Sequence, residues 1–399
     1  MAATCFDDRV VALLERIENM TVVVSESSEA IDAIFVSIEL SKNSWLVTSL
    51  SPDTGGKLSR HGVPGGDIAG LLDRLLQLRC KARERTGKDC RLVIIHEAGF
   101  DGFWVQRVLE AEGHESYVVD AASIATSRRR RRAKTDRLDG ETLIRTLLAF
   151  KRGEPRACSM VRIPSLAEED RRRICRERKI LLTERVRHSN RIKGFLFSQG
   201  IRGYSPFQRD RREKLEALRT GDGRPLPDHL KRQIRRELDR LELLQRQIAE
   251  VEAERDEMLA REKQSSPEVA MLTNIIGIGP EFAGVLWSEG LSRHFDNRRQ
   301  IAAYAGLAPT PWQSGSIDRE QGIGKSGNRL LRHTLLEMAW LWLRHQPQTA
   351  LSQWFNERIA QSGGRFKKVM ITALARKLVV TLWKYVTAGV VIEGVRLRA

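Results

Sequence analysis

Residues 33–39 read Ala-Ile-Phe-Val-Ser-Ile-Glu, an apolar run of strand character that ends in a carboxylate. Residues 92–97 read Leu-Val-Ile-Ile-His-Glu and repeat this arrangement further along the chain. Short apolar runs rich in β-branched residues are typical of buried strands. We therefore expect two strands of one sheet, with Glu39 and Glu97 able to meet at one end of it.

The segments around these runs extend the pattern into an α/β unit. Further strands are expected at residues 45–50, 57–63 and 116–119, with Gly55-Gly56 as a hairpin turn. Helical spacing of apolar residues predicts helices at residues 67–85, 103–112 and 136–150. Three strands followed by alternating helices and strands predict an α/β layout with a mixed sheet.

Two more carboxylates, Asp136 and Asp139, stand at the start of the last of these helices. Residues three apart on a helix share one face. Acidic groups held close together repel one another unless a positive charge lies between them. Each acid alone is more simply a surface residue, but the four in this order favour a site for Mg²⁺ or Mn²⁺, ions that prefer oxygen ligands.

The chain is strongly basic, with a net charge of +17 and a pI near 10.1 over 399 residues. Residues 125–220 hold 28 Lys and Arg against 12 Asp and Glu, a net charge of +16, so most of the excess lies in one quarter of the chain. A concentrated positive charge favours a nucleic-acid partner over a merely solvated surface. The candidate contacts are Arg128, Arg129, Arg130, Arg131, Arg132, Lys134, Arg171, Arg172, Arg173, Arg185, Lys193 and Lys325.

The middle of the chain is predicted to be helical. Residues 160–215 form a very basic helical region, and residues 228–263 carry apolar residues in heptads. The heptad residues are Ile234, Leu241 and Ile248 at one core position and Leu244, Val251 and Met258 at the other. Glu237 and Arg255 interrupt the seam. The spacing predicts a coiled coil whose partner helix comes from another subunit or from the same chain, and we favour self-association.

The C-terminal part is expected to be mainly α-helical. Residues 272–290 contain Gly277-Ile278-Gly279-Pro280 between two helical stretches. This arrangement is similar to a helix-hairpin-helix element, whose glycine turn brings backbone N–H groups close to a phosphate. An ordinary connection between two helices explains the pattern equally well.

Lys134-Thr135-Asp136-Arg137-Leu138-Asp139 resembles the K-T-D-x-x-D segment of DEDD-type insertion-sequence transposases. Residues 36–42 are similar to that family's G-I-D-x-S-K motif and residues 97–99 to its E-A-T/S-G motif. Residues 302–309 resemble A-A-Y-x-G-L-x-P. Residues 313–315 and 325–332 together resemble S-G…K-x-G-N-x-x-L-R. The motifs follow the family's order, and the resemblance covers about residues 33 to 390.

The resemblance implies a ribonuclease-H or RuvC-like domain over residues 31–160 and a serine-bearing transposase domain over residues 266–399. Residues 161–265 form the basic helical and coiled-coil region between them, and residues 1–30 are an N-terminal extension.

The resemblance also assigns roles. Glu39, Glu97, Asp136 and Asp139 would hold the metal, and Ser314 falls on the family's nucleophilic serine, which forms a phosphoserine link with DNA. Ser316 and Ser326 are alternatives, and Ser314 is preferred because Gly315 follows it, as in the motif. Arg319 and Lys325 could hold the phosphate, although each of them taken singly is more simply a solvent-exposed residue. The family's first acid is usually Asp, so Glu39 places its carboxylate one methylene further out.

The implied partners are a structured non-coding bridge RNA that acts as guide, and donor and target DNA. We also expect the chain to form a dimer or tetramer through the coiled coil. We expect it in the bacterial cytoplasm, associated with the nucleoid. One rival function is a RuvC-like junction nuclease that uses metal-activated water and leaves Ser314 idle. Another is a non-catalytic nucleic-acid-binding protein.

Cysteine usage and hydropathy limit the other classes of protein. The five cysteines are odd in number and form no CxxC pair, which is typical of free thiols in a reducing compartment. No apolar run reaches the roughly 18 residues that a membrane span needs. We therefore expect neither a zinc site nor a membrane partner.

Overall fold

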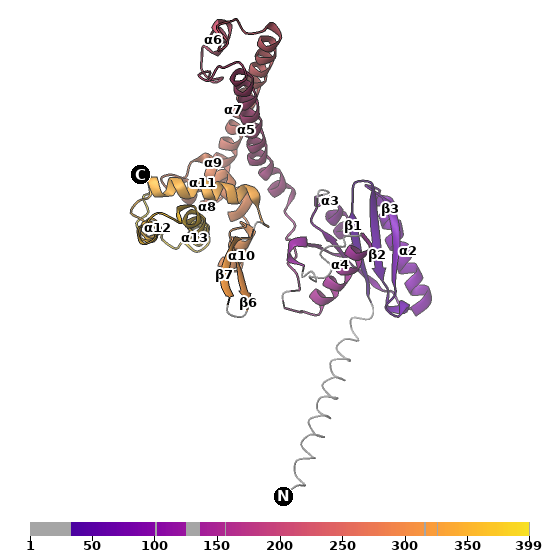
Figure 1. Cartoon of the computed structure of the whole chain (residues 1–399). Coiled ribbons are helices and arrows are strands. Elements are labelled where there is room, and N and C mark those ends of the chain that lie inside the picture. Colours follow the sequence, from indigo (N-terminus) through magenta and orange to yellow (C-terminus); the bar gives the residue numbers. More distant parts are fainter. Residues whose placement is uncertain are drawn as a thin grey trace. The chain divides into compact units, whose positions relative to one another are not determined.

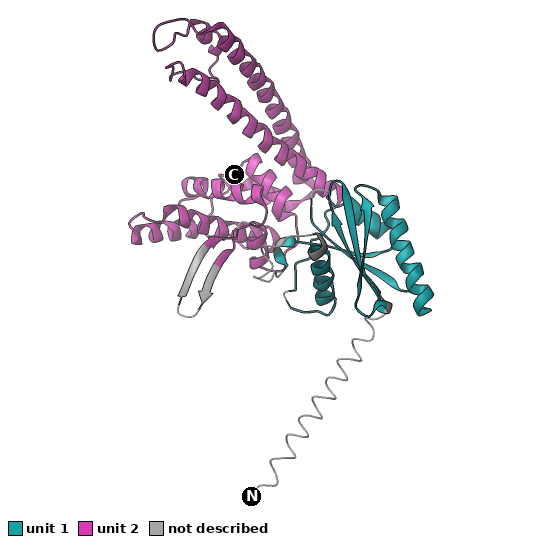
Figure 2. Ribbon diagram, turned by 45° about the vertical axis from the view of Figure 1, so that its right-hand side comes forward, with its two compact units in different colours: residues 1–164 teal, residues 165–399 magenta. Residues whose placement is uncertain are grey.

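The computed structural model describes residues 33–99, 102–124, 136–155, 157–314, 317–324 and 326–398. The chain divides into two compact units that meet in sequence at Pro164 and Ser165 (Figure 2). The predicted N-terminal extension (residues 1–30), the arginine run Arg128–Arg132 and Lys134 lie outside the described residues. The predicted boundary between residues 265 and 266 falls inside the second unit.

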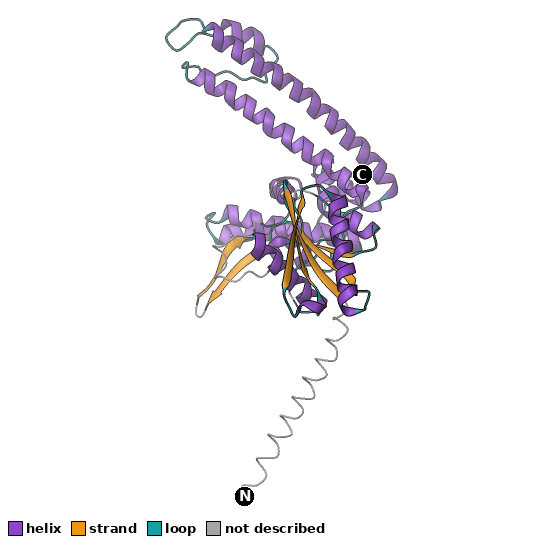
Figure 3. Ribbon diagram, turned by 90° about the vertical axis from the view of Figure 1, so that its right-hand side faces the viewer, coloured by secondary structure: helices purple, strands orange, loops and turns teal. Residues whose placement is uncertain are grey.

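A mixed sheet forms the centre of the first unit (Figure 3). It has five strands in the order β3-β2-β1-β4-β5. Its strands are β1 (Ala33–Leu40), β2 (Ser44–Leu50), β3 (Leu58–Pro64), β4 (Arg91–Glu97) and β5 (Glu115–Val119). β1, β2 and β3 pair antiparallel, whereas β1, β4 and β5 pair parallel. The predicted α/β class, the mixed sheet and the five predicted strands are confirmed.

Helices cover both faces of this sheet because alternate residues of each strand are apolar on both sides. On one face, Val36 shares a core cluster with Leu71 of α2. On the other face, Phe35 shares a cluster with Leu143 of α4. The helices of the unit are α2 (Ile68–Thr86), α3 (Trp104–Ala111) and α4 (Asp136–Lys151), with the short 3₁₀ turns η2 (Pro52–Thr54) and η3 (Ala121–Ser123).

A long helical hairpin opens the second unit (Figure 1). It consists of α5 (Leu166–Phe197) and α7 (Asp228–Ser265), with α6 (Arg211–Ala217) between them. A capping box starts α5, in which Ser165 and Glu168 each accept a hydrogen bond from the other's backbone N–H. The prediction of helix throughout residues 160–215 is wrong at residues 160–165 and 198–210, which form no helix. Gly200, with φ of 78°, leaves the helical conformation there.

The heptad seam of α7 is buried inside this hairpin. Leu244, Ile248 and Val251 share a core cluster with Leu181 of α5. Closer to α6, Ile234 and Leu241 join a cluster that also contains residues of α5. The partner helix of the seam is therefore α5 of the same chain, one of the two alternatives open from the sequence. Association of whole chains through this seam stays a prediction.

The rest of the second unit is mainly helical, around a core that contains Leu335, Trp342 and Leu378. Its elements are α8 (Pro267–Asn274), α9 (Pro280–Leu286), the π-helical η4 (Trp287–Leu291), α10 (Arg298–Tyr304), α11 (Arg329–His345), α12 (Ala350–Gln361), α13 (Lys367–Ala388) and the strands β6 (Pro309–Ser314) and β7 (Ile317–Ile323). Within the described part of the chain, no helix is both long and apolar enough to cross a membrane.

The two-stranded ribbon β6–β7 is a feature that the sequence did not predict. Pro309 and Pro311 argue against a strand, because proline donates no hydrogen bond to a sheet ladder. A ribbon of two strands has only edges, where proline is tolerated, and the register shifts between these two prolines. The ribbon carries Ser314 as the last residue of β6.

Candidate active site

Glu39 and Glu97 lie at equivalent positions on two neighbouring parallel strands. Ile38 of β1 pairs with His96 of β4, so the next residue on each strand is one of the two glutamates. Side chains alternate between the faces of a sheet, which places both carboxylates on the face opposite Ile38 and His96. This is the face that α4 covers. The predicted meeting of Glu39 and Glu97 at one end of the sheet agrees with this register.

The first turn of α4 lies over the same end of the sheet. Gly140 packs against β1 and β2, and its carbonyl oxygen accepts a hydrogen bond of 2.8 Å from Ser37 Oγ. Further along α4, Leu143 and Leu147 share a core cluster with Phe35. The helix therefore runs back along β1, and its first turn, which contains Asp136 and Asp139, lies towards Glu39.

The donor set at this end of the sheet suits a divalent ion. Glu39 and Asp139 are partly buried and Glu97 is exposed, so carboxylate oxygens come from two strands and one helix. The side chain of Asp136 lies outside what the structure describes. Among the described side chains, no three His, Cys, Asp or Glu residues form a group that could hold a metal. The four-carboxylate site is therefore a prediction that rests on the backbone positions of its members.

Ser314 ends β6, where it pairs with Ile317 at the start of β7. The side chain of Ser314, Ser316, the side chain of Arg319 and Lys325 lie outside the described residues. Hydrogen bonds close the base of the ribbon. Gly324 N donates to Ala308 O at 2.8 Å, and Thr310 Oγ1 donates to Gly322 O at 3.0 Å.

The two sequence motifs on either side of this ribbon contact each other directly. Asn328 N donates to Tyr304 O at 2.7 Å, which joins the start of α11 to the end of α10. Gly327 has φ of 123°, and a Cβ there would lie 2.7 Å from Gly306 N and from Tyr304 O. Only glycine allows this approach. The motifs A-A-Y-x-G-L and K-x-G-N thus form the base from which the serine-bearing ribbon extends.

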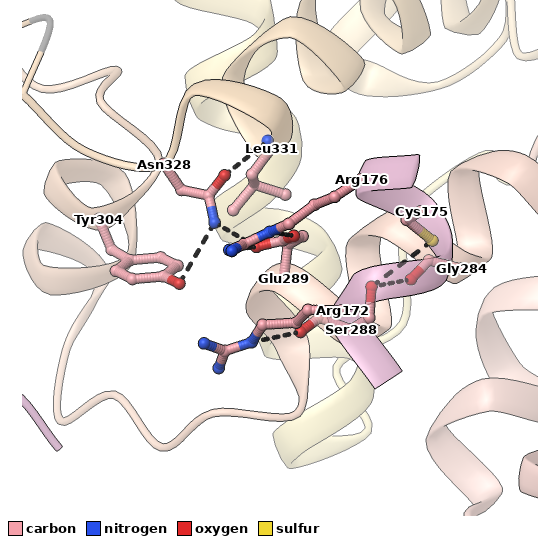
Figure 4. Close-up of polar contacts among 9 residues, drawn as sticks. All are labelled: Arg172, Cys175, Arg176, Gly284, Ser288, Glu289, Tyr304, Asn328 and Leu331. Atoms are coloured by element: carbon pink, nitrogen blue, oxygen red, sulfur yellow. Dashed lines mark hydrogen bonds and ion pairs between the residues drawn. The ribbon is translucent and has the colours of Figure 1, made fainter. Parts of the chain in front are cut away.

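Asn328 also caps α11 and reaches a buried carboxylate (Figure 4). Its Oδ1 accepts from Leu331 N at 3.0 Å, and its Nδ2 donates to Glu289 Oε2 at 2.6 Å. Glu289 is 0% exposed and forms a bidentate ion pair with Arg176 of α5. The hydrogen bond to Glu289 raises the pKa of the Arg176 guanidinium. Sequence reasoning missed Glu289, since nothing distinguishes it from a surface acid in the one-dimensional pattern.

The candidate basic contacts on α5 divide into buried and exposed residues. Arg172 is only 7% exposed, and its Nε donates to Ser288 O at 3.2 Å, so a nucleic-acid contact does not fit its position. Arg171 pairs with Glu262 at 2.9 Å, and Arg185 lies over the ring of Phe207. Arg173 and Lys193 are exposed and stay candidates.

The glycine turn between α8 and α9 has an internal role. Gly277, with φ of 95°, packs so closely that a Cβ would lie 2.9 Å from His345 Cβ. Arg398 donates hydrogen bonds to Thr273 O at 2.7 Å and to Ile278 O at 3.2 Å. The turn therefore anchors the end of the chain, and a helix-hairpin-helix contact with phosphate stays a prediction.

Comparison with known proteins connects both regions to one family. A DEDD transposase model of the IS110 type matches residues 68–199, and a model described as "Transposase IS116/IS110/IS902 family" matches residues 269–353. A Sinorhizobium fredii (strain NBRC 101917 / NGR234) protein named as a transposase, y4rJ, is 66% identical over 371 residues, which is 91% of this chain and 94% of the relative.

This chain belongs to the IS110 family of transposases.

More distant relatives match parts of this IS110-family transposase. The transposase for insertion sequence element IS1328 of Yersinia enterocolitica is 28% identical over 222 residues, or 54% of this chain and 62% of the relative. A pilin gene-inverting protein of Moraxella bovis is 36% identical over 111 residues, or 27% of this chain and 34% of the relative. Membership of the family makes the chain an enzyme that cuts and recombines DNA, and it implies a ribonuclease-H or RuvC-like fold for the first unit.

Proposed function

We propose that this transposase is a bridge-RNA-guided recombinase in which Ser314 is the nucleophile and Glu39, Glu97, Asp136 and Asp139 hold Mg²⁺ or Mn²⁺. The observation that carries the proposal is the placement of the acids. Two carboxylates end adjacent parallel strands in register, and the first turn of α4 lies over the same strand ends. The serine proposal rests on the ribbon base formed by residues 304–308, 324 and 326–328.

A divalent ion at these carboxylates would neutralise charge on the scissile phosphate and activate an attacking oxygen. The chain's part is to hold the oxygen donors in place. β1 and β4 are central strands, with residues of both in the core clusters on either face. The Ser37–Gly140 hydrogen bond ties the acid-bearing turn of α4 to β1. Rigid elements of this kind position ligands better than loops do.

The proposed reaction exchanges one phosphate ester for another. The Ser314 hydroxyl oxygen forms a bond to phosphorus, the bond from phosphorus to a DNA sugar oxygen breaks, and the serine proton passes to solvent while the sugar oxygen takes up a proton. A second DNA hydroxyl reverses the exchange and releases the serine. No external energy source is needed, because the number of phosphate ester bonds is conserved at each step.

Nucleic-acid recognition is proposed for the basic surface that includes Arg173 and Lys193, together with the arginine run before α4. Phosphate contacts of this kind make binding fall steeply with salt. We propose that sequence choice is delegated to base pairing with a structured guide RNA. The named activity of the Moraxella bovis relative, inversion of a pilin gene, supports DNA rearrangement at defined sites. We also propose that the chain acts as a dimer or tetramer.

Two experiments test the proposal. Sequencing of RNA that copurifies with the protein should yield one discrete structured species whose loops match the element ends and the target, and only degraded RNA would contradict guidance. In a strand-exchange assay, Ser314→Ala should abolish the product, with Ser316→Ala and Ser326→Ala as matched controls. Asp139→Ala should also abolish it while nucleic-acid binding survives.

A second candidate is a metal-dependent nuclease that uses water in place of Ser314. The acids alone would suffice for this chemistry, and the match of residues 68–199 to a DEDD transposase model includes three of them, Glu97, Asp136 and Asp139. The variant series separates the two candidates. Cleavage that survives Ser314→Ala and is lost in Asp139→Ala would support the water mechanism.

A further inference from the structure

Glu289 is a fully buried carboxylate with an unusual position in the backbone. It is 0% exposed and lies in η4, a π-helical turn. π-Helical turns are rare and occur frequently at functional sites. A carboxylate buried in this way is costly unless ion pairs and hydrogen bonds compensate for the loss of water. Arg176 Nε and Nη2 donate to it at 2.7 and 2.9 Å, and Asn328 Nδ2 donates at 2.6 Å.

These contacts connect three parts of the second unit (Figure 4). Arg176 comes from α5, Glu289 from η4, and Asn328 from the start of α11. Neighbouring bonds strengthen the connection, since Arg172 Nε donates to Ser288 O at 3.2 Å. Asn328 Nδ2 also lies 3.3 Å from the Tyr304 hydroxyl. The direction of the Asn328 side chain is therefore set by Glu289 and Tyr304 together.

Asn328 determines where the serine-bearing ribbon begins. Its backbone N–H holds Tyr304 O, and the glycine before it packs against Gly306. Residues 306–308 lead directly into β6, and Gly324 directly follows β7. A change at Glu289 would therefore shift both ends of the ribbon together, and with them the end of β6 at Ser314.

We propose that Glu289 is a positioning residue for strand cleavage, which acts through Asn328 on the ribbon that presents Ser314. The inference rests on the proposed role of Ser314. In this proposal, Glu289 contacts none of the reacting groups. Its function is to fix the geometry of the ribbon base with a buried negative charge, which Arg176 balances from a side chain that is 54% exposed.

The chain supplies a matched control in Glu237. This carboxylate is 3% exposed and accepts hydrogen bonds from His188, Arg191 and Arg240 within the α5–α7 hairpin. Glu289→Gln and Glu237→Gln therefore remove the same charge from equally buried, arginine-paired sites. Only the first of them contacts the ribbon base.

The experiment measures three quantities for both variants: the rate of strand cleavage at saturating DNA, the affinity for DNA, and hydrogen exchange of peptides that cover residues 309–323. Glu289→Gln should slow cleavage roughly tenfold or more, since displacements near 1 Å are costly to catalysis, and should leave affinity unchanged. It should also speed exchange in the ribbon. Glu237→Gln should change neither the cleavage rate nor ribbon exchange.

Asn328→Ser provides the same test if Glu289→Gln fails to fold. Serine keeps a side-chain oxygen to cap Leu331 N but lacks the amide that donates to Glu289, so the same loss of rate is expected. A cleavage rate equal to that of Glu237→Gln would overturn the inference. So would a loss of rate and affinity in parallel with a fall in Tm, because it would indicate general destabilisation.

Ser314→Ala in the same assay distinguishes a failure of the proposed nucleophile Ser314 from a failure of the positioning role of Glu289. If it abolishes cleavage while Glu289→Gln does not slow it, the positioning role fails and the nucleophile stands. If Ser314→Ala retains cleavage, the proposed nucleophile fails, and so does the positioning role that depends on it.

Discussion

Replacing Gly140 with alanine tests whether the first turn of α4 is seated on the end of β1. A Cβ at this position would lie 2.6 Å from Thr48 Oγ1, 3.3 Å from Thr48 Cβ and 3.4 Å from Ser37 Oγ. Ordinary contact begins at 3.4 Å, so the gap must open by 0.8 Å, the difference between 3.4 and 2.6 Å. Thr48 is fully buried, so we expect the helix to shift away from the sheet.

The shift has two consequences of calculable size. Overpacking a buried contact costs about 1–3 kcal/mol, and the gain in helix propensity from glycine to alanine returns about 1 kcal/mol. The net loss of unfolding free energy is therefore about 0–2 kcal/mol. Displacement of Asp136 and Asp139 by nearly an ångström should lower catalysis by about tenfold to a hundredfold. Affinity for Mn²⁺ should fall as well, because two of the four proposed ligands move.

Gly194→Ala is the matched control, since a Cβ at Gly194 in α5 meets nothing within 4 Å. This variant should gain about 0.5–1 kcal/mol and keep full activity. Unfolding in urea, Mn²⁺ titration and a strand-cleavage assay measure the three effects. Full activity and unchanged Mn²⁺ affinity in Gly140→Ala would refute the placement of α4 over Glu39 and Glu97.

Three further predictions follow from contacts in the second unit. Gly327→Ala should destabilise by about 2 kcal/mol or more and abolish activity, because φ is 123° and the new Cβ would meet backbone atoms of Gly306 and Tyr304 at 2.7 Å. Gly322→Ala, with φ of 98° but open space around it, should lose less in the same unfolding assay. Arg172→Ala should lower Tm because it empties a buried hydrogen-bonded position, whereas Arg173→Ala should leave Tm unchanged and reduce the salt dependence of nucleic-acid binding. The reverse pattern would contradict the assignment of Arg172 to the interior. Burial alone raises the pKa of Glu237, but hydrogen bonds from His188 and Arg191 outweigh it and hold the pKa below its ordinary value. The lowered pKa contributes stability that is fully present above the unfolded-state pKa and is lost as pH falls through the folded-state pKa, so Glu237→Gln should flatten the acid limb of a Tm-against-pH curve.

The sequence predicted the first unit well because its information is local. Apolar strand runs, turn glycines and helical spacing are each recognised within a few residues. The parallel pairing of β1 and β4 then brings Glu39 and Glu97 to the same end of the sheet. Gly140 could have been noticed as well. A glycine inside a helical pattern costs about 1 kcal/mol, so it indicates close packing when it directly follows a candidate ligand such as Asp139.

The features that the sequence did not reveal depend on contacts between distant segments. Pro309 and Pro311 hid the ribbon β6–β7, because local rules place proline outside strands. Glu289 joins residues of α5 and α11, which are more than a hundred positions apart along the chain. The heptads of α7 predicted a partner helix. A heptad pattern is the same whether that helix is α5 of the same chain or a helix of another subunit.

The most direct test of the account is to capture the protein on DNA and identify the attached residue. The protein, the RNA that copurifies with it and nicked or suicide DNA substrates would be incubated with Mg²⁺, denatured, digested with protease and analysed by mass spectrometry. The account predicts a nucleotide-modified peptide with phosphate on Ser314, absent in Asp139→Ala. Cleaved DNA without any protein-linked product, or a link on another residue, would contradict it.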